Sequence, residues 1–261
     1  MRSMGDPPAF IDLRAYGPLN DFLPGPLRGH TIRRRLHGTP AVKDVIEAAG
    51  SPHPEVQLVC VNGDPVGFGH RLGPGDRVAV YPPFRTVALG PVLLAGPPPL
   101  PPNETTFVLD GHLGRLAAYL RLSGFDTLYR RDAADDELAR LAGDGRVLLT
   151  RDLGLLKRSA VVRGAFVRSD RPSEQLIETF QRFDLADAVR PFVRCLRCNQ
   201  LLEPADRGFA RDLVPPRVYR EQVEFRRCPA CGRLFWRGSH VARMSRLLAG
   251  VIAAAGGRAT V

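Results

Sequence analysis

The sequence lacks a run of about eighteen apolar residues, which a helix needs to cross a bilayer. Residues 1–8 also lack the basic-then-apolar order of a secretory signal. We therefore expect a cytoplasmic protein with no membrane partner. The chain has 261 residues, of which 44% are hydrophobic, so it can form two or three modest domains.

Cysteine is scarce, with five residues in the whole chain. Four of them form two pairs in the C-terminal part, and the fifth, Cys60, stands alone in an apolar run where we expect a core residue. In a cytosolic chain, paired cysteines indicate a metal site more than disulfides.

Acidic residues are outnumbered, with 27 Asp and Glu against 37 Lys and Arg, and the formal charge is +10. Arginine supplies nearly all of the excess. A positive balance suits a polyanionic partner, because each phosphate that is neutralised releases counterions. A high-GC genome, which favours Arg, Ala, Gly and Pro, is the other explanation, and composition alone leaves both open.

A proline-rich stretch divides the chain. It includes the run 96–102, in which five of seven residues are proline, and proline at this density forms a stiff, extended linker. We place a linker at 90–103 and see no internal repeat.

Before the linker, the pattern predicts strand, strand, helix, strand, strand. The turn signals are Asn62-Gly63, which favours a tight hairpin, and the stretch 73–76. Thr39 can cap the helix and Gly50 can end it. The predicted elements are strands at 9–16, 31–36, 56–61 and 77–81, and a helix at 39–50.

This part resembles the β-grasp, ubiquitin-like family, especially its sulfur-carrier branch, through the stretches 59–63 and 72–78. The resemblance covers roughly residues 10–84. Sulfur carriers end in a free Gly-Gly tail, whereas here Tyr81 continues into Pro82-Pro83-Phe84. The resemblance therefore implies a docking role for this part more than sulfur transfer.

After the linker, short apolar strands alternate with helices, which favours a parallel sheet with helices on its faces. Gly124 can close the first helix, and Ser173 can cap the last. The predicted strands are 105–109, 125–129, 146–149 and 165–167, and the helices lie near 113–124, 135–141 and 173–180.

Carboxylates follow the strands of this sheet. Asp110, Asp152 and Asp170 each come after a strand, and the adjacent Asp135 and Asp136 open a helix. In parallel sheets, sites form at the carboxyl ends of strands, and Mg²⁺ or Mn²⁺ prefers oxygen ligands. Any one of these residues taken alone fits a loop or a helix cap, so the prediction depends on their joint placement.

Two C-x-x-C pairs, Cys195/Cys198 and Cys228/Cys231, are separated by 29 residues. Two residues between cysteines let both thiolates face one ion, and two pairs complete a closed four-sulfur site. The sequence therefore predicts a structural zinc.

The order of motifs resembles the Mut-seven C-terminal RNase family, through the stretches 110–126, 135–138 and 148–152. That family is similar to PIN nucleases, carries a zinc ribbon and occurs fused to a ubiquitin-like domain. The resemblance implies that Asp110, Asp135 or Asp136, and Asp152 bind catalytic Mg²⁺ or Mn²⁺. Asp170 matches by position alone.

The stretch 236–240 resembles the terminal motif of that family. Ser239 and His240 are candidates for holding a phosphate. Arg115, Arg121 and Arg151 lie close in sequence to the acidic loops and are candidates for attracting phosphates, although a solvated surface is the commoner use of such arginines. Trp236 either stacks on a base or packs on the zinc ribbon. The arginines between the cysteine pairs touch RNA or are solvated; they are Arg207, Arg211, Arg217 and Arg220.

Together these observations predict an α/β protein: a ubiquitin-like β-grasp domain (1–89), a linker (90–103), a PIN-like core with a parallel α/β/α sheet (104–190), and a zinc ribbon with a tail (191–261). The predicted function is a metal-dependent ribonuclease that acts on RNA, with a protein partner for the ubiquitin-like domain. The alternative is a non-enzymatic RNA-binding adaptor that recruits a partner through that domain.

Overall fold

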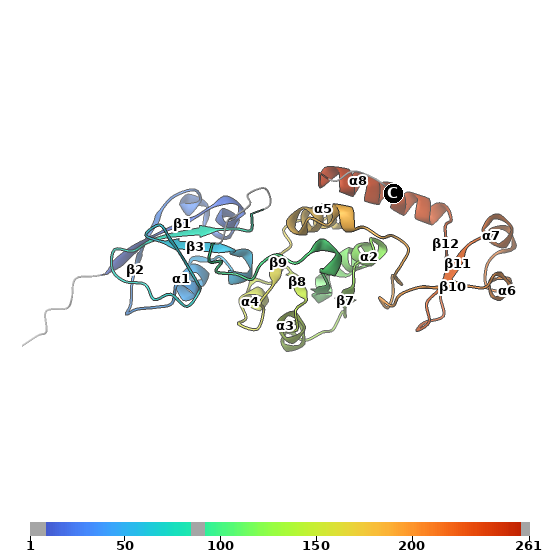
Figure 1. The fold of residues 1–261 in the computed structure, drawn as a ribbon, viewed down its shortest axis with the longest axis horizontal. Coiled ribbons are helices and arrows are strands. Elements are labelled where there is room, and N and C mark those ends of the chain that lie inside the picture. Colours follow the sequence, from blue (N-terminus) through green and yellow to red (C-terminus); the bar gives the residue numbers. More distant parts are fainter. Residues whose placement is uncertain (1–8, 85–91, 257–261) are drawn as a thin grey trace, which may run out of the picture. The chain divides into compact units, whose positions relative to one another are not determined.

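The computed structural model describes residues 9–84 and 92–256 and, for residues 239–243, the backbone alone. The chain divides into two compact units, one of residues 1–99 and 152–166 and the other of residues 100–151 and 167–261. Figure 1 draws helices and strands in both, so the predicted α/β class is confirmed. The domain boundaries given above stay a prediction.

Residues 10–81 of the first unit form a β-grasp fold. Its strands are β1 (Phe10–Ala15), β2 (Ile32–Arg35), β3 (Leu58–Val61), β4 (Asp64–Val66) and β5 (Arg77–Tyr81), its helix is α1 (Val42–Ala49), and its 3₁₀ turns are η1 (Gly17–Phe22), η2 (Gly25–Leu27) and η3 (His53–Glu55). The sheet has the order β2-β1-β5-β3-β4, with β1 and β5 parallel. Helix α1 packs Val42 and Ile46 into the core beside Ile11, Leu13 and Val59.

In this unit, the predicted turn at 62–63 and the predicted helix end are confirmed, whereas the predicted helix N-cap is wrong. Asn62 and Gly63 have φ of 55° and 102° and join β3 to β4, as an Asn-Gly hairpin requires. Gly50, with φ of 123°, ends α1 as predicted. The prediction that Thr39 caps α1 is wrong, because Ala41 pairs with Arg71 in a β-bridge and keeps the chain extended until Val42.

The prediction that Cys60 is a core residue is wrong. This residue lies on β3 between the buried residues Val59 and Val61, and the alternation of a strand turns it toward the opposite face of the sheet. Its side chain is therefore half-buried instead of lying in the core. Burial raises the pKa of the Cys60 thiol, and the nearby Asp64 adds to this effect.

Part of the predicted linker packs on the first unit. Ala95 N–H donates to the Gln57 carbonyl at 2.9 Å, and Gly96 lies so close to Val56 O that an added Cβ would be 2.6 Å from it. The linker residues 85–91 lie outside the described residues. The segment 152–166 also belongs to this unit and contains α4 (Leu153–Leu156), which the sequence did not predict, and β9 (Gly164–Phe166).

The second unit is built around three parallel strands in the order β7-β6-β8. These are β6 (Phe107–Leu109), β7 (Thr127–Tyr129) and β8 (Val147–Thr150), and the main helices are α2 (Gly114–Leu122), α3 (Asp135–Gly143), α5 (Pro172–Phe183) and α8 (Ser239–Ala254). Figure 1 draws α2 and α5 on one side of the strands and α3 on the other. This is the predicted α/β/α layering.

Two features of these helices differ from the sequence predictions. Helix α5 begins at Pro172 with Arg171 as N-cap and no side-chain cap, so the predicted Ser173 cap is wrong; proline is well suited to the first turn. Helix α8 was not predicted. It packs against α5, buries Leu248, Val251 and Ile252, and accepts a hydrogen bond from Gln181 at its C-terminal end.

The remaining elements form a small antiparallel sheet, β10-β11-β12, with two short helices between its first two strands. They are β10 (Glu203–Ala205), α6 (Arg207–Ala210), α7 (Pro216–Glu221), β11 (Phe225–Arg227) and β12 (Leu234–Trp236), and two further 3₁₀ turns, η4 (Pro102–Glu104) and η6 (Ala186–Ala188), flank the core. Within residues 9–84 and 92–256, no helix combines the length and apolarity needed to cross a membrane.

Candidate metal centre and active site

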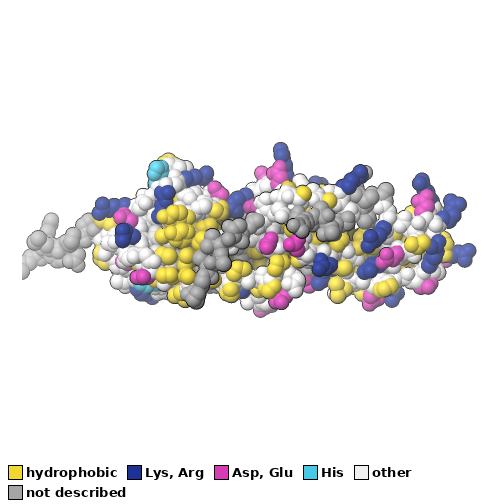
Figure 2. Space-filling model, turned by 45° about the horizontal axis from the view of Figure 1, so that its top comes forward, with side chains coloured by type: hydrophobic (Ala, Val, Ile, Leu, Met, Phe, Trp, Pro, Cys, Tyr) yellow, Lys and Arg dark blue, Asp and Glu magenta, His cyan; other side chains and the backbone are white. Residues whose placement is uncertain are grey.

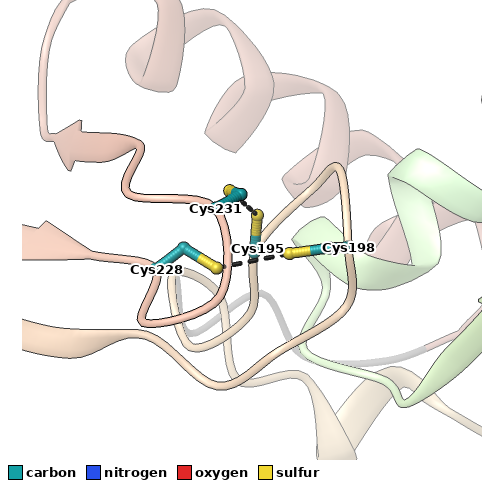
Figure 3. A group of neighbouring side chains, drawn as sticks. All are labelled: Cys195, Cys198, Cys228 and Cys231. Atoms are coloured by element: carbon teal, nitrogen blue, oxygen red, sulfur yellow. Dashed lines mark hydrogen bonds between the residues drawn. The ribbon is translucent and has the colours of Figure 1, made fainter.

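The four paired cysteines converge. Their Sγ atoms all lie within 4.8 Å of one another, with Cys195 and Cys231 3.7 Å apart and Cys198 and Cys228 3.3 Å apart (Figure 3). A tetrahedral ion with Zn–S bonds of about 2.3 Å separates its sulfurs by about 3.8 Å. The donor set and its spacing therefore fit one zinc ion, as predicted.

The two cysteine loops have the same backbone fold. In the first, Cys195 N–H donates to Gln200 O and Asn199 N–H donates to Cys195 O; in the second, Cys228 pairs with Arg233 and Gly232 in the same way. Asn199 and Gly232, each four residues after the first cysteine, have φ of 68° and 71°. These matched turns aim each pair of thiols at one point, which is the geometry of a zinc knuckle.

The thiols cannot all ionise together without an ion between them. Burial raises the pKa of Cys195, and it raises that of Cys198 to about 12 with help from the Cys228 thiol. Burial also opposes ionisation of Cys228, but hydrogen bonds from the backbone of Cys231 and from Cys198 outweigh it and lower the Cys228 pKa to about 7. A metal ion would remove this conflict, because it binds all four as thiolates.

A buried polar network joins the first knuckle to the core of the second unit. Arg121 of α2, only 5% exposed, donates to Thr127 O on β7 and to the knuckle carbonyls of Leu196 and Arg197 at 3.1 and 2.8 Å. Burial lowers the Arg121 pKa, and the nearby Cys195 and Cys198 oppose that shift. The sequence placed Arg121 with surface or phosphate-facing arginines, so the structure corrects this.

Asn199 is the second member of this network. Its side-chain oxygen accepts from Thr127 N–H at 3.0 Å, and its amide donates to Asp126 at 3.0 Å. The Asp126 carboxylate also pairs with Arg146 at 2.7 Å and with Arg194 at 3.4 Å. No local pattern in the sequence marks Asn199, because its partners Thr127 and Asp126 lie 72 and 73 positions away.

Asp110 is the most enclosed of the predicted acidic residues, at 7% exposure directly after β6. One oxygen accepts from His112 N–H at 3.0 Å; the other accepts from the Thr150 hydroxyl at 2.5 Å and from Arg151 N–H at 3.1 Å. Thr150 is the last residue of β8, so two neighbouring parallel strands meet at this carboxylate. The Asp110 carboxylate is thus fixed where β6 and β8 end, and its role as a metal ligand stays a prediction.

The other predicted acidic residues are exposed. Asp135 and Asp136 lie in the first turn of α3, whose N-cap is Ala134. Asp152 belongs to the first unit and caps α4 through hydrogen bonds from Gly154 and Leu155 N–H. Asp170 pairs with Arg151 at 2.7 Å. Among the described residues, the cysteines are the group whose ligand atoms already meet.

The predicted substrate-contacting residues have different surroundings. Arg115 is exposed at the start of α2, whereas Arg151 donates to the carbonyls of Val167, Arg168 and Ser169. Ser239 and His240 begin α8, but their side chains lie outside the described residues. Their roles toward substrate, like that of Arg115, stay predictions.

In the ribbon, Trp236 packs against a cluster of Ala210, Val214 and Phe225, which confirms its packing interpretation. Arg207 ties α6 to α7 through Tyr219 and Gln222, and so is not simply solvated. Arg211, Arg217 and Arg220 are exposed.

Comparison with known proteins agrees with this arrangement. The Mut7-C RNAse domain family matches residues 105–248, more than half of the chain, and the Mut7-C ubiquitin family matches residues 9–88. No curated protein and no solved structure gives a significant match. The chain therefore belongs to the Mut7-C RNase family and carries that family's ubiquitin domain ahead of its RNase domain.

Proposed function

We propose that this protein is a metal-dependent ribonuclease that hydrolyses RNA phosphodiester bonds at an acidic site of Asp110, Asp135 or Asp136, and Asp152. The observation that carries the proposal is the Asp110 carboxylate, enclosed where β6 and β8 end and held by three donors, in a chain of an RNase family.

The residues present suit Mg²⁺ or Mn²⁺. An ionised carboxylate offers about four lone-pair directions, and the three donors to Asp110 leave about one for an ion. Asp152 follows Arg151 directly, and Arg151 N–H already touches Asp110 at 3.1 Å. Covalent connection alone thus keeps the backbone of Asp152 near Asp110, because consecutive Cα atoms are about 3.8 Å apart.

The chain's own groups have distinct roles in this proposal. Thr150 and the backbone N–H groups fix the orientation of Asp110, as outer hydrogen bonds do for metal ligands generally. Exposed arginines such as Arg115 attract the phosphate backbone, and Figure 2 shows Lys and Arg side chains spread over the face that it draws. A bound Mg²⁺ or Mn²⁺ would supply water activation and charge neutralisation at the phosphate.

The four-cysteine centre has a structural part in the proposal. Four thiolates fill the coordination sphere of zinc and leave no open position for substrate. We assign it the folding of the ribbon and, through Arg121 and Asn199, the attachment of the ribbon to the core.

The ubiquitin-like domain is proposed to bind a protein as well. Its exposed aromatic residue Tyr16, at 39% exposure, stacks on Tyr81 with ring centroids 4.5 Å apart. Figure 2 also shows hydrophobic side chains gathered on the face of this unit that it draws. Such surfaces commonly serve protein contacts.

The test is cleavage of end-labelled single-stranded, structured and duplex RNAs with Mn²⁺, Mg²⁺ or EDTA. We expect metal-dependent cleavage that Asp110→Asn and Asp152→Asn each reduce by at least a hundredfold, and that Asp144→Asn leaves unchanged. Asp144 is a matched control, because it is an exposed carboxylate paired with Arg140 at 3.0 Å. Equal, metal-independent background in all variants, with RNA affinity intact, would favour the adaptor alternative.

A further inference from the structure

One segment belongs to the RNase domain by sequence and to the ubiquitin-like unit by its contacts. Residues 152–166 lie inside the family match of 105–248, yet they cluster with residues 1–99. The segment begins with Asp152 and contains α4 and β9. Two of the polar contacts that hold it come from η3, the turn of residues 53–55.

His53 is the first of these contacts. The side chain is buried, with Nδ1 2.6 Å from Glu47 Oε1 and Nε2 2.9 Å from the Val161 carbonyl. Val161 is fully buried, and Phe68 packs edge-on against the imidazole at 5.9 Å. The ring is therefore fixed from three directions, and one of its two nitrogens is committed to the backbone of the segment.

Glu55 is the second contact. It is 2% exposed, and its Oε1 accepts from Phe166 N–H at 2.7 Å at the end of β9. The Phe166 ring in turn packs edge-on against Phe22 at 5.9 Å. A carboxylate is costly to bury unless donors reach it, so this N–H has a clear energetic role.

The segment contributes contacts of its own. Lys157 Nζ donates to the Glu47 carbonyl at 2.9 Å, and Arg163 donates to the Pro98 carbonyl at 3.1 Å. Glu47 thus bonds His53 through its side chain and Lys157 through its backbone. Buried Leu155 and Leu156 add an apolar contribution.

We propose that the ubiquitin-like part of this chain acts in cis as a support for residues 152–166, with His53, Glu55 and Lys157 as positioning residues for Asp152. The proposal rests on the proposed function in so far as Asp152 is a metal ligand. The segment that η3 binds is then part of the same chain. By restricting the motion of residues 152–166, this contact favours metal binding at the acidic site.

Hydrogen exchange of the full-length protein tests the support directly. His53→Phe removes both ring hydrogen bonds and keeps a ring, and Lys157→Met removes the bond to Glu47 and keeps an aliphatic chain. The control is Arg34→Met, which loses a similar bond to the neighbouring Ala48 carbonyl, 3.2 Å long, without touching the segment. We expect exchange in peptides of 152–166 to rise about fivefold to tenfold in the first two variants and to stay unchanged in the control.

A metal titration of cleavage provides the second readout. The first two variants should need about tenfold more Mn²⁺ for half-maximal rate, and excess Mn²⁺ should restore the maximal rate, since loosened outer support weakens ligands. Lys157→Arg, which keeps the donor, should behave as the wild type. A general loss of folding would lower the maximal rate without this rescue.

Unchanged hydrogen exchange of 152–166 in folded Lys157→Met would overturn the proposal. If His53→Phe does not fold, Lys157→Met is the variant that decides. A second outcome is faster exchange of 152–166 in His53→Phe and Lys157→Met with an unchanged Mn²⁺ requirement. If Asp152→Asn still abolishes cleavage, that outcome would refute the effect of the support on metal binding but not the proposed ribonuclease activity. Full activity of Asp152→Asn would instead refute the proposed acidic site, and with it the role of these residues toward Asp152.

Discussion

Chelating the zinc proposed for the four cysteines should unfold the two knuckles, because the apolar cluster around the thiols is small. The apolar cluster there consists of the buried residues Cys195, Leu202 and Cys228, with Cys198, Cys231 and Phe235 partly buried against it. Burying one leucine and part of a phenylalanine contributes about 2–5 kcal/mol. Structural zinc typically contributes about 10–16 kcal/mol. We therefore expect the knuckles to lose their structure when the metal is chelated.

Thiol counting and metal analysis together measure this. The native protein should contain about one zinc per chain. A thiol reagent should then modify Cys60 alone of the five cysteines, and all five after a strong chelator. Hydrogen exchange should rise throughout 195–236, and Cys228→Ser should reproduce the chelated state.

The result that would refute this reasoning is specific. Five reactive thiols and no zinc in protein purified without chelators, with the amides of 195–236 still protected, would show that the ribbon folds without metal. Cys60→Ser is the control, since it should remove the one reactive thiol of the native protein and leave zinc content unchanged.

Three further outcomes are expected. Arg121→Met should weaken the attachment of the first knuckle by about 2–4 kcal/mol through the loss of three carbonyl contacts; zinc release to a chelator should be faster than in the exposed control Arg217→Met. Gly124→Ala should destabilise the second unit by at least about 1–3 kcal/mol in urea unfolding, since φ is 100° and the new Cβ would lie 2.3 Å from the Arg190 carbonyl. Although burial opposes it, the hydrogen bonds from Arg146 and Asn199 lower the Asp126 pKa. Because the folded value is below the unfolded one, this stabilisation is complete above about pH 4 and is lost as the pH falls further. The stability gap between wild type and Asp126→Asn should therefore narrow below pH 4, and a constant gap would contradict the assignment.

Local chemistry made several features predictable from the sequence. Asn62-Gly63 requires a tight turn because both residues adopt positive φ, and the two C-x-x-C pairs specify a four-sulfur centre because their spacing lets the thiols converge. Alternating strands and helices likewise predicted the parallel sheet. Helix α8 was also within reach, because Leu247, Leu248, Val251 and Ile252 recur at helical spacing.

Burial and long-range contacts could not be predicted from the sequence. Cys60 looked like a core residue, and only the pairing of β3 showed which face of the sheet it occupies. Arg121 looked like a surface arginine, but it lies under a knuckle some 75 positions away. A guanidinium has no local signature of burial, since what decides is whether carbonyls from elsewhere surround it.

The sequence by itself predicted most of the strands and helices, the family, and the four cysteines that meet, because each depends on short local patterns. Tertiary structure alone decided which residues make the long-range contacts. Asn199 of the first knuckle bonds Asp126, and His53 and Glu55 bond residues of the segment 152–166. These contacts pair groups some 70 to 111 positions apart, and no periodicity or spacing records such a separation.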